Sequence, residues 1–122
     1  MPSRSSGGGR LVRLESQVQR VLAELLSREV KDPRVGPLTV TQVKLAPDLS
    51  IARVYYVPFG RAEAGPDMEE GLAAAAGFLR GEVGRRAGLR HAPRLQFIFD
   101  DSFDRAARLN ALIDSASKPR ES

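Results

Sequence analysis

Apolar residues recur at three- and four-residue steps between residues 10 and 31, which predicts one apolar stripe along a helix. The stripe consists of Leu11, Leu14, Val18, Val21, Leu22, Leu25 and Leu26. Pro33 disfavours helical geometry in the residue before it, so we expect the helix to end near Asp32. Residues 1–9, MPSRSSGGG, hold almost nothing apolar and predict a disordered leader.

Three segments rich in β-branched and aromatic residues predict strands at 38–45, 50–57 and 94–99. The turn signal between the first two, Ala46 to Leu49, predicts that they pair as an antiparallel hairpin. Tyr55 and Tyr56 are neighbours in the second strand, so we expect them to point to opposite faces of the sheet.

The rest of the chain predicts helices. We expect a helix over 67–76, a kink near Gly77, a second helix to about Ala87, and a last helix over about 103–115. Residues 116–122 predict a flexible tail, which leaves 10–115 as one domain. The order α-β-β-α-kink-α-β plus a C-terminal helix favours an α+β fold, with a three-stranded sheet packed by helices.

Composition excludes several kinds of chemistry. The chain has no Cys and one His, His91, which excludes disulfides, thiolate metal sites and a site built from several histidines. Asp100, Asp101 and Asp104 stand at a strand end and at a helix start, where helix capping and the helix dipole explain them better than a magnesium site. The usual catalytic and nucleotide-binding motifs are absent. We therefore expect no enzymatic activity, no cofactor and no metal.

Apolar runs fall short of the roughly 18 residues that span a bilayer, and the first residues lack the apolar core of a secretory signal. We expect no membrane association and a cytoplasmic location. Nothing in the sequence demands a dimer, so we expect a monomer.

Positive charge is concentrated in one part of the chain. The net charge is +4 and the pI is about 10.1, which raises the expectation of a nucleic-acid partner. Residues 80–94 hold five arginines against one glutamate. The candidate phosphate-binding residues are Arg80, Arg85, Arg86 and Arg90, with Arg13, Arg20 and Lys31 as weaker candidates. Simple solvation of a helix face is the alternative interpretation.

Four glycines lie in and next to the basic window 80–94. Gly81-Glu82-Val83-Gly84 has the GXXG form of the loop that clamps nucleic acid in KH domains, but it lies within a helical stretch and Glu82 would repel phosphate. Gly77, Gly81, Gly84 and Gly88 recur on one helical face. Because each weakens the helix, we expect this face to approach a neighbouring surface closely.

Four segments in order resemble the bacterial ribosome-binding factor A family. They are Arg28-Glu29-Val30-Lys31-Asp32-Pro33-Arg34-Val35-Gly36, the 48–55 segment DLSIARVY, the 75–80 segment AAGFLR, and residues 94–102. The resemblance covers about residues 10–115.

The resemblance implies a type II KH-like fold in which a kink at Ala75, Ala76 and Gly77 replaces the clamping loop. It implies binding to the free small (30S) ribosomal subunit and assistance in late maturation of 16S rRNA, without enzymatic activity. Functional links to assembly GTPases and to cold adaptation are further expectations from the family.

A protein-interaction adaptor is the alternative function. The first helix would then present its charged face to a protein of the ribosome assembly machinery, and RNA contact would be incidental.

Overall fold

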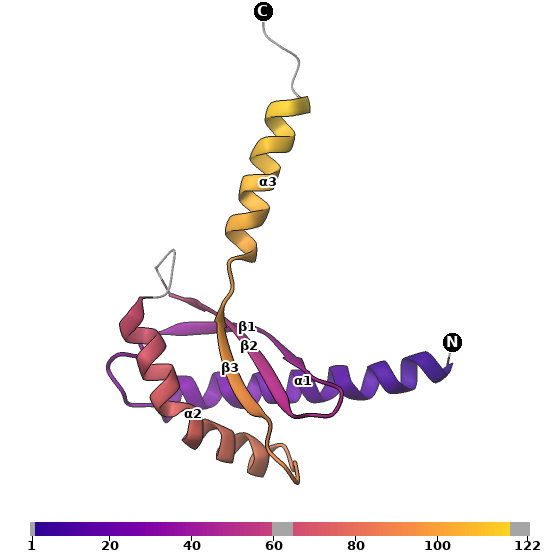
Figure 1. The fold of residues 1–122 in the computed structure, drawn as a ribbon, viewed down its shortest axis with the longest axis vertical. Helices are drawn as coiled ribbons and strands as arrows, with labels where there is room; N and C mark the ends of the chain where they lie inside the picture. Colours follow the sequence, from indigo (N-terminus) through magenta and orange to yellow (C-terminus); the bar gives the residue numbers. More distant parts are fainter. Residues whose placement is uncertain (1, 60–64, 118–122) are drawn as a thin grey trace, which may run out of the picture.

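The computed structural model describes residues 2–59 and 65–117. Its elements are, in order, α1 (Pro2–Arg28), β1 (Leu38–Leu45), β2 (Ile51–Pro58), α2 (Pro66–Arg86), β3 (Arg94–Phe99) and α3 (Ser102–Ser117). One sheet has the order β1-β2-β3, with β1 antiparallel and β3 parallel to β2 (Figure 1). The α+β arrangement expected from the sequence is confirmed.

The core lies on one face of the sheet. Val18, Leu22 and Leu25 of α1 are fully buried against Val54 of the central strand, and α2 adds further apolar side chains. Along β2, buried and more exposed positions alternate, as a sheet with one covered face requires. Tyr56 is accordingly buried, while its neighbour Tyr55 lies on the opposite face, as the sequence predicted.

Helix α1 also protects the free edge of β1. Gln19 Nε2 donates a hydrogen bond to the Val40 carbonyl at 3.0 Å, and Glu15 Oε2 accepts one from the Leu45 N–H at 2.9 Å. Unpaired backbone groups at a sheet edge otherwise invite pairing with another chain. Polar residues of α1 thus complete the sheet while its apolar stripe fills the core.

Both ends of α1 differ from the expectation. The helix begins at Pro2, so residues 2–9, expected to be a disordered leader, are helical, and it ends at Arg28, which leaves Lys31 in the connection to β1. Extending a helix that is already nucleated costs far less than starting one, which explains the continuation toward the N-terminus. Residues 118–122 of the expected tail and residues 60–64 of the loop before α2 lie outside the described residues.

Helix α2 runs without interruption from Pro66 to Arg86, so the predicted kink does not divide it into two helices. Figure 1 shows the axis of α2 changing direction along its length. A kink centred on Ala75, Ala76 and Gly77 stays a prediction.

The glycines of α2 have different surroundings. A Cβ at Gly71 would lie 2.6 Å from Val35 Cγ2, and one at Gly84 would lie 3.0 Å from the Ala92 Cβ. Close approach within the chain therefore explains these two positions. Gly77 and Gly81 face open space, so the predicted close approach is not made there by the described part of the chain.

Helix α3 projects away from the sheet (Figure 1). Its apolar positions Leu109, Leu112 and Ile113 are all more than half exposed. The sequence led us to expect helices packed on the sheet, but α1 and α2 already cover its apolar face, and the other face carries the charged side chains of Lys44, Arg53 and Arg94.

Candidate nucleic-acid interface

Two of the candidate phosphate-binding residues, Arg80 and Arg90, line a hollow of about 450 Å³. Three segments form the hollow: the later part of α2, the connection from α2 to β3, and the turn between β1 and β2. Its lining residues are Asp48, Leu49, Ser50, Arg80, Leu89, Arg90, His91 and Ala92. The fold thus brings Arg80, Arg90 and His91 together, and it adds a turn that the sequence analysis did not connect with them.

Gly88 allows the connection to return along α2. Its φ of +68° lies in the left-handed region that favours glycine, and it follows directly after the helix C-cap at Ala87. The absence of a side chain at Gly84 then lets Ala92 approach the helix closely. This local geometry places Arg90 and His91 beside Arg80.

Arg80 is held in place by the same connection. Its Nε and Nη2 atoms each donate a hydrogen bond to the Ala92 carbonyl at 3.1 Å. This contact orients the guanidinium without neutralising it, and the residue stays exposed. Arg90 is also exposed, and neither arginine forms an ion pair within the described ranges. Both positive charges are available to an anion.

Asp48 is the carboxylate among the residues that line the hollow. It accepts hydrogen bonds from the Ser50 N–H at 3.0 Å and from Ser50 Oγ at 2.7 Å. These bonds lower the pKa of Asp48 below its ordinary value, so it stays charged at neutral pH. An anion would therefore bind on the side of Arg80 and Arg90, away from this carboxylate.

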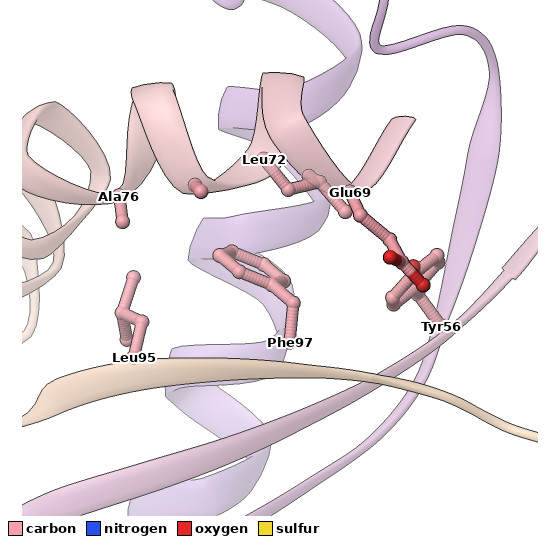
Figure 2. A pocket seen from close by; sticks show the side chains of 7 residues that line it. Tyr56, Glu69, Leu72, Ala76, Leu95 and Phe97 are labelled. Carbon is pink, nitrogen blue, oxygen red and sulfur yellow. The ribbon is translucent and has the colours of Figure 1, made fainter. Parts of the chain in front are cut away.

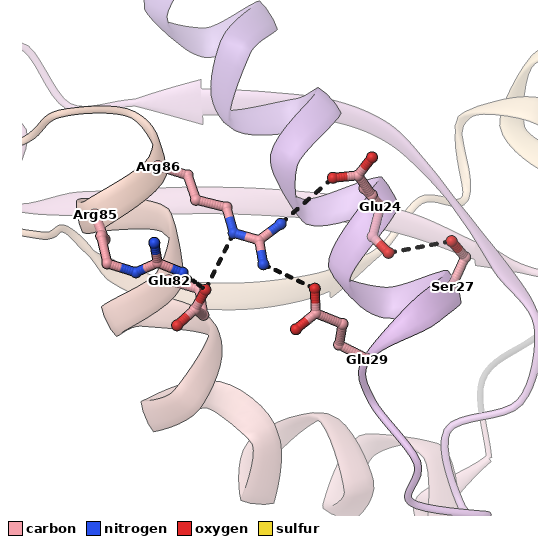
Figure 3. A network of polar contacts seen from close by, with 6 residues as sticks. All are labelled: Glu24, Ser27, Glu29, Glu82, Arg85 and Arg86. Carbon is pink, nitrogen blue, oxygen red and sulfur yellow. Dashed lines mark hydrogen bonds and ion pairs between the residues drawn. The ribbon is translucent and has the colours of Figure 1, made fainter.

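Arg86 is partly exposed, but its guanidinium points toward acidic side chains of the same chain (Figure 3). Its guanidinium contacts the carboxylates of Glu29 at 2.7 Å, Glu82 at 3.1 Å and Glu24 at 3.4 Å. The hydrogen bond to Glu29 is the main cause of the raised pKa of Arg86. Because three carboxylates surround it, we assign Arg86 a structural role that joins α2 to α1 and to the turn after α1.

The other predicted cations do not line the hollow. Arg85 is exposed and pairs with Glu82, which also binds Arg86 (Figure 3). Arg13 and Arg20 are exposed on α1, and Lys31 is exposed in the connection after it. An RNA contact by any of these residues stays a prediction.

Asp100 stabilises the turn before α3 and also contacts β1. It accepts hydrogen bonds from the Ser102 N–H at 2.9 Å and from Thr41 Oγ1, and these lower its pKa. Across residues 2–59 and 65–117, no group of three His, Asp or Glu side chains is placed to hold a metal ion.

A second hollow, of about 270 Å³, lies between α2 and β3 and has a different character (Figure 2). Leu72, Leu95 and Phe97 make it largely apolar, and Glu69 lies beside Tyr56 at one end. Burial, and secondarily the charge of Glu69, raises the pKa of Tyr56. A hollow whose one charged group is a carboxylate is unsuited to phosphate, so it is not part of the interface.

Three cations lie on the uncovered face of the sheet: Arg94 stands at the end of the basic window 80–94 but was not among the candidate phosphate-binding residues, and Lys44 and Arg53 were not predicted at all. Lys44 on β1, Arg53 on β2 and Arg94 on β3 are all exposed. The available signal was their position among strand residues that alternate between buried and exposed.

Within the part of the chain that the structure covers, no helix is long and apolar enough to cross a membrane.

Comparison with known proteins places these features in a family context. Residues 10–113 match the family model described as ribosome-binding factor A. The ribosome-binding factor A of Thioalkalivibrio sulfidiphilus is 49% identical over 107 residues, which cover 88% of this chain and 83% of that protein. The one from Azoarcus sp. is 42% identical over 121 residues, which cover 99% of this chain and 94% of that protein.

Solved structures give the same result for the fold. The crystal structure of ribosome-binding factor A from Thermus thermophilus superposes with a TM-score of 0.64 at 34% identity, over 72% of this chain and 93% of that chain. A homology model of the Thermus thermophilus factor, fitted into the cryo-EM map of a 30S complex, superposes with a TM-score of 0.62 at 34% identity, over 73% and 93%. These likenesses confirm the KH-like fold.

Proposed function

This chain is a member of the ribosome-binding factor A family, and from that membership we propose that it binds the free 30S subunit and assists late maturation of 16S rRNA. The observation that carries the proposal is the extent of the match. It spans residues 10–113 and so includes every residue of the hollow around Arg80 and Arg90. The likeness to a factor fitted into a 30S complex supports the same partner.

The chemistry of the hollow suits rRNA phosphates. Arginine presents a planar set of donors that matches a phosphate group, and Arg80 is already oriented by the Ala92 carbonyl. Phosphate contacts position a protein on RNA without reading its sequence, so specificity would come from the shape of the rRNA. Such binding weakens as salt rises, because each contact releases counterions from the RNA.

We propose that the protein acts by binding and not by catalysis. His91, the single histidine of the chain, is exposed and has no side-chain hydrogen bond to a carboxylate of the described residues that would make it a general base. Functional links to assembly GTPases, a monomeric state and a role in cold adaptation stay predictions.

Co-sedimentation of the full chain with isolated 30S subunits, 50S subunits and 70S ribosomes tests the proposed partner. Selective retention on free 30S subunits supports the proposal, and equal retention on all three would reduce it to general RNA binding. Retention through ribosomal proteins alone, insensitive to ribonuclease, would favour the adaptor function.

The proposed role in maturation is tested in cells that lack the gene. Unprocessed 16S rRNA precursor should accumulate and should decline when the wild-type chain is restored. Normal processing in the deletion strain would contradict that role.

A further inference from the structure

The sheet has one face that neither α1 nor α2 covers. In β2, Ala52, Val54 and Tyr56 point into the core, so Arg53 and Tyr55 point outward. In the strand register, Arg53 of β2 lies opposite Lys44 of β1 on one side and opposite Gln96 of β3 on the other. Arg94 lies two residues before Gln96 and shares the same face. Three exposed cations therefore occupy one end of the outer face.

The pairing of Lys44 with Arg53 is unfavourable for the folded protein alone. Like charges directly opposite each other on neighbouring strands destabilise a sheet. The outward positions next to this pair offer no carboxylate, since they are Gln42, Ile51, Tyr55 and Gln96. Asp100, two residues after Ile98, contacts Thr41 Oγ1 of β1 toward the other end of the sheet. Lys44, Arg53 and Arg94 also form no ion pair within residues 2–59 and 65–117. A polyanion would relieve this repulsion.

An aromatic side chain adjoins the cations. Tyr55 follows Arg53 on the same face and lies between Gln42 on β1 and Ile98 on β3. It is half-buried, so its neighbours support the ring and leave part of it open. Aromatic rings beside a positively charged groove bind single-stranded nucleic acid, because the bases stack while the phosphates meet the cations.

The outer face is continuous with the hollow around Arg80 and Arg90. The Arg94 N–H donates a hydrogen bond to the Ser50 carbonyl at 3.0 Å, and Ser50 lines the hollow. Ala92, two residues before Arg94, lines it as well. One strand of RNA can therefore pass from the hollow around the start of β3 onto the sheet.

We infer that the outer face of the sheet binds a single RNA strand, with Lys44, Arg53 and Arg94 on its phosphates and Tyr55 stacked on a base. The inference rests on the proposed function in taking RNA as the polymer. An acidic protein segment would satisfy the three cations but would leave the aromatic ring without a matching group, so the observations favour RNA.

The test measures binding of the full chain to a fluorescein-labelled oligouridylate by fluorescence polarisation across a salt series. We expect the triple variant Lys44→Ala, Arg53→Ala, Arg94→Ala to bind about tenfold or more weakly. Its slope of log affinity against log salt should fall by about 2, because three phosphate contacts are lost at about 0.7 each. Arg108→Ala, an exposed arginine on α3, is the matched control and should bind as the wild type does.

Tyr55 gives a second and independent readout. Tyr55→Ala should weaken binding about fivefold or more without changing the salt slope, and Tyr55→Phe should restore it, because stacking needs the ring and not the hydroxyl. Unfolding midpoints of all variants establish that each one folds. If the triple variant matches the wild type in both affinity and salt slope, the inference is overturned.

The variant Arg80→Ala, Arg90→Ala separates this inference from the proposed function. The sheet variant is the triple variant Lys44→Ala, Arg53→Ala, Arg94→Ala. If it retains oligonucleotide binding while 30S binding depends on Arg80 and Arg90, the inference about the outer face fails and the proposed 30S binding stands. If the sheet variant loses oligonucleotide binding while the wild type shows no retention on 30S subunits, the inference stands and the function fails.

Discussion

Arg86 Nη2 lies 2.7 Å from Glu29 Oε2, although 57 residues separate them in the sequence. The contact joins the last turn of α2 to the turn after α1, and Glu24 and Glu82 complete the network around the same guanidinium. An arginine in the middle of the most basic window is thus surrounded by carboxylates. Among the described residues, Arg80 and Arg90 have no carboxylate partner, so they and not Arg86 carry charge that is available to an anion.

Replacing Arg86 should mainly lower the stability of the fold and should have less effect on RNA binding. Arg86→Met should lower the midpoint of thermal unfolding, because it leaves Glu24, Glu29 and Glu82 without their shared partner. Arg85→Met is the matched control, since Arg85 is two-thirds exposed and pairs only with Glu82 among these three acids. Circular dichroism melts of both variants measure the difference. Equal midpoints would show that the network around Arg86 contributes nothing.

Two glycines of α2 should respond in opposite directions to alanine. Gly71→Ala should destabilise the protein by about 1–3 kcal/mol, because its Cβ would press on Val35 and the Arg34 Cβ. Gly77→Ala should stabilise it by about 1 kcal/mol, because the position is open and alanine favours the helix. Urea denaturation gives both values.

Binding of the Gly77→Ala variant to 30S subunits then tests whether the region of the predicted kink contacts the subunit. A variant that is more stable but retained less on 30S subunits would place this part of α2 at the interface. Retention equal to the wild type would remove Gly77 from the proposed site.

Lys44→Glu should separate stability from binding on the sheet. The new glutamate would stand opposite Arg53 and replace a repulsive pair with an attractive one. Cross-strand pairs of this kind contribute about 0.2–1 kcal/mol, so the unfolding midpoint should rise. RNA binding should weaken in the same variant, since a carboxylate repels phosphate. A lower midpoint would contradict the register, and unchanged binding would contradict the RNA contact.

Asp32 should titrate at an unusually low pH, because the charged guanidinium of Arg34 binds its carboxylate. Hydrogen bonds from Arg34, including one from its Nη2 at 2.6 Å, lower the pKa of Asp32 from its ordinary 3.8 to about 2. A lowered pKa stabilises the folded state above pH 3.8, and that contribution is lost as the pH falls through about 2. NMR of the side-chain carboxyl carbon should show the low midpoint. Arg34→Gln should return it toward 3.8, and a midpoint that stays low would assign the shift to another cause.

The sequence was sufficient for the type and order of most elements, but not for the bounds of α1, the continuity of α2 or the surroundings of individual side chains. The spacing of Val18, Leu22 and Leu25 correctly predicted the buried stripe of α1, because helix periodicity is a local property. The ion pairing of Arg86 could not be predicted, because only the tertiary fold brings Glu29 next to it. The same applies to Gly77 and Gly84, which look alike in the sequence but face open space and Ala92 respectively.

The site was predicted in part for the same reason. Arg80 and Arg90 stand in one basic window, so local composition identified them. Lys44 and Arg53 lie far from that window in the sequence, and only the register of three strands brings them onto one face with Arg94 at the end of the window. Sequence patterns find a charge cluster when one helix carries it, and overlook one that a sheet assembles.

The most direct test of the central claim is the retention of Arg80→Glu, Arg90→Glu on free 30S subunits as salt rises. Arg108→Glu on α3 is the matched control, because it reverses an exposed arginine outside the hollow. We predict that the double variant folds normally yet is lost from 30S subunits at a salt concentration where the wild type and the control are retained. Retention of the double variant equal to that of the wild type across the whole salt series would contradict binding through this hollow.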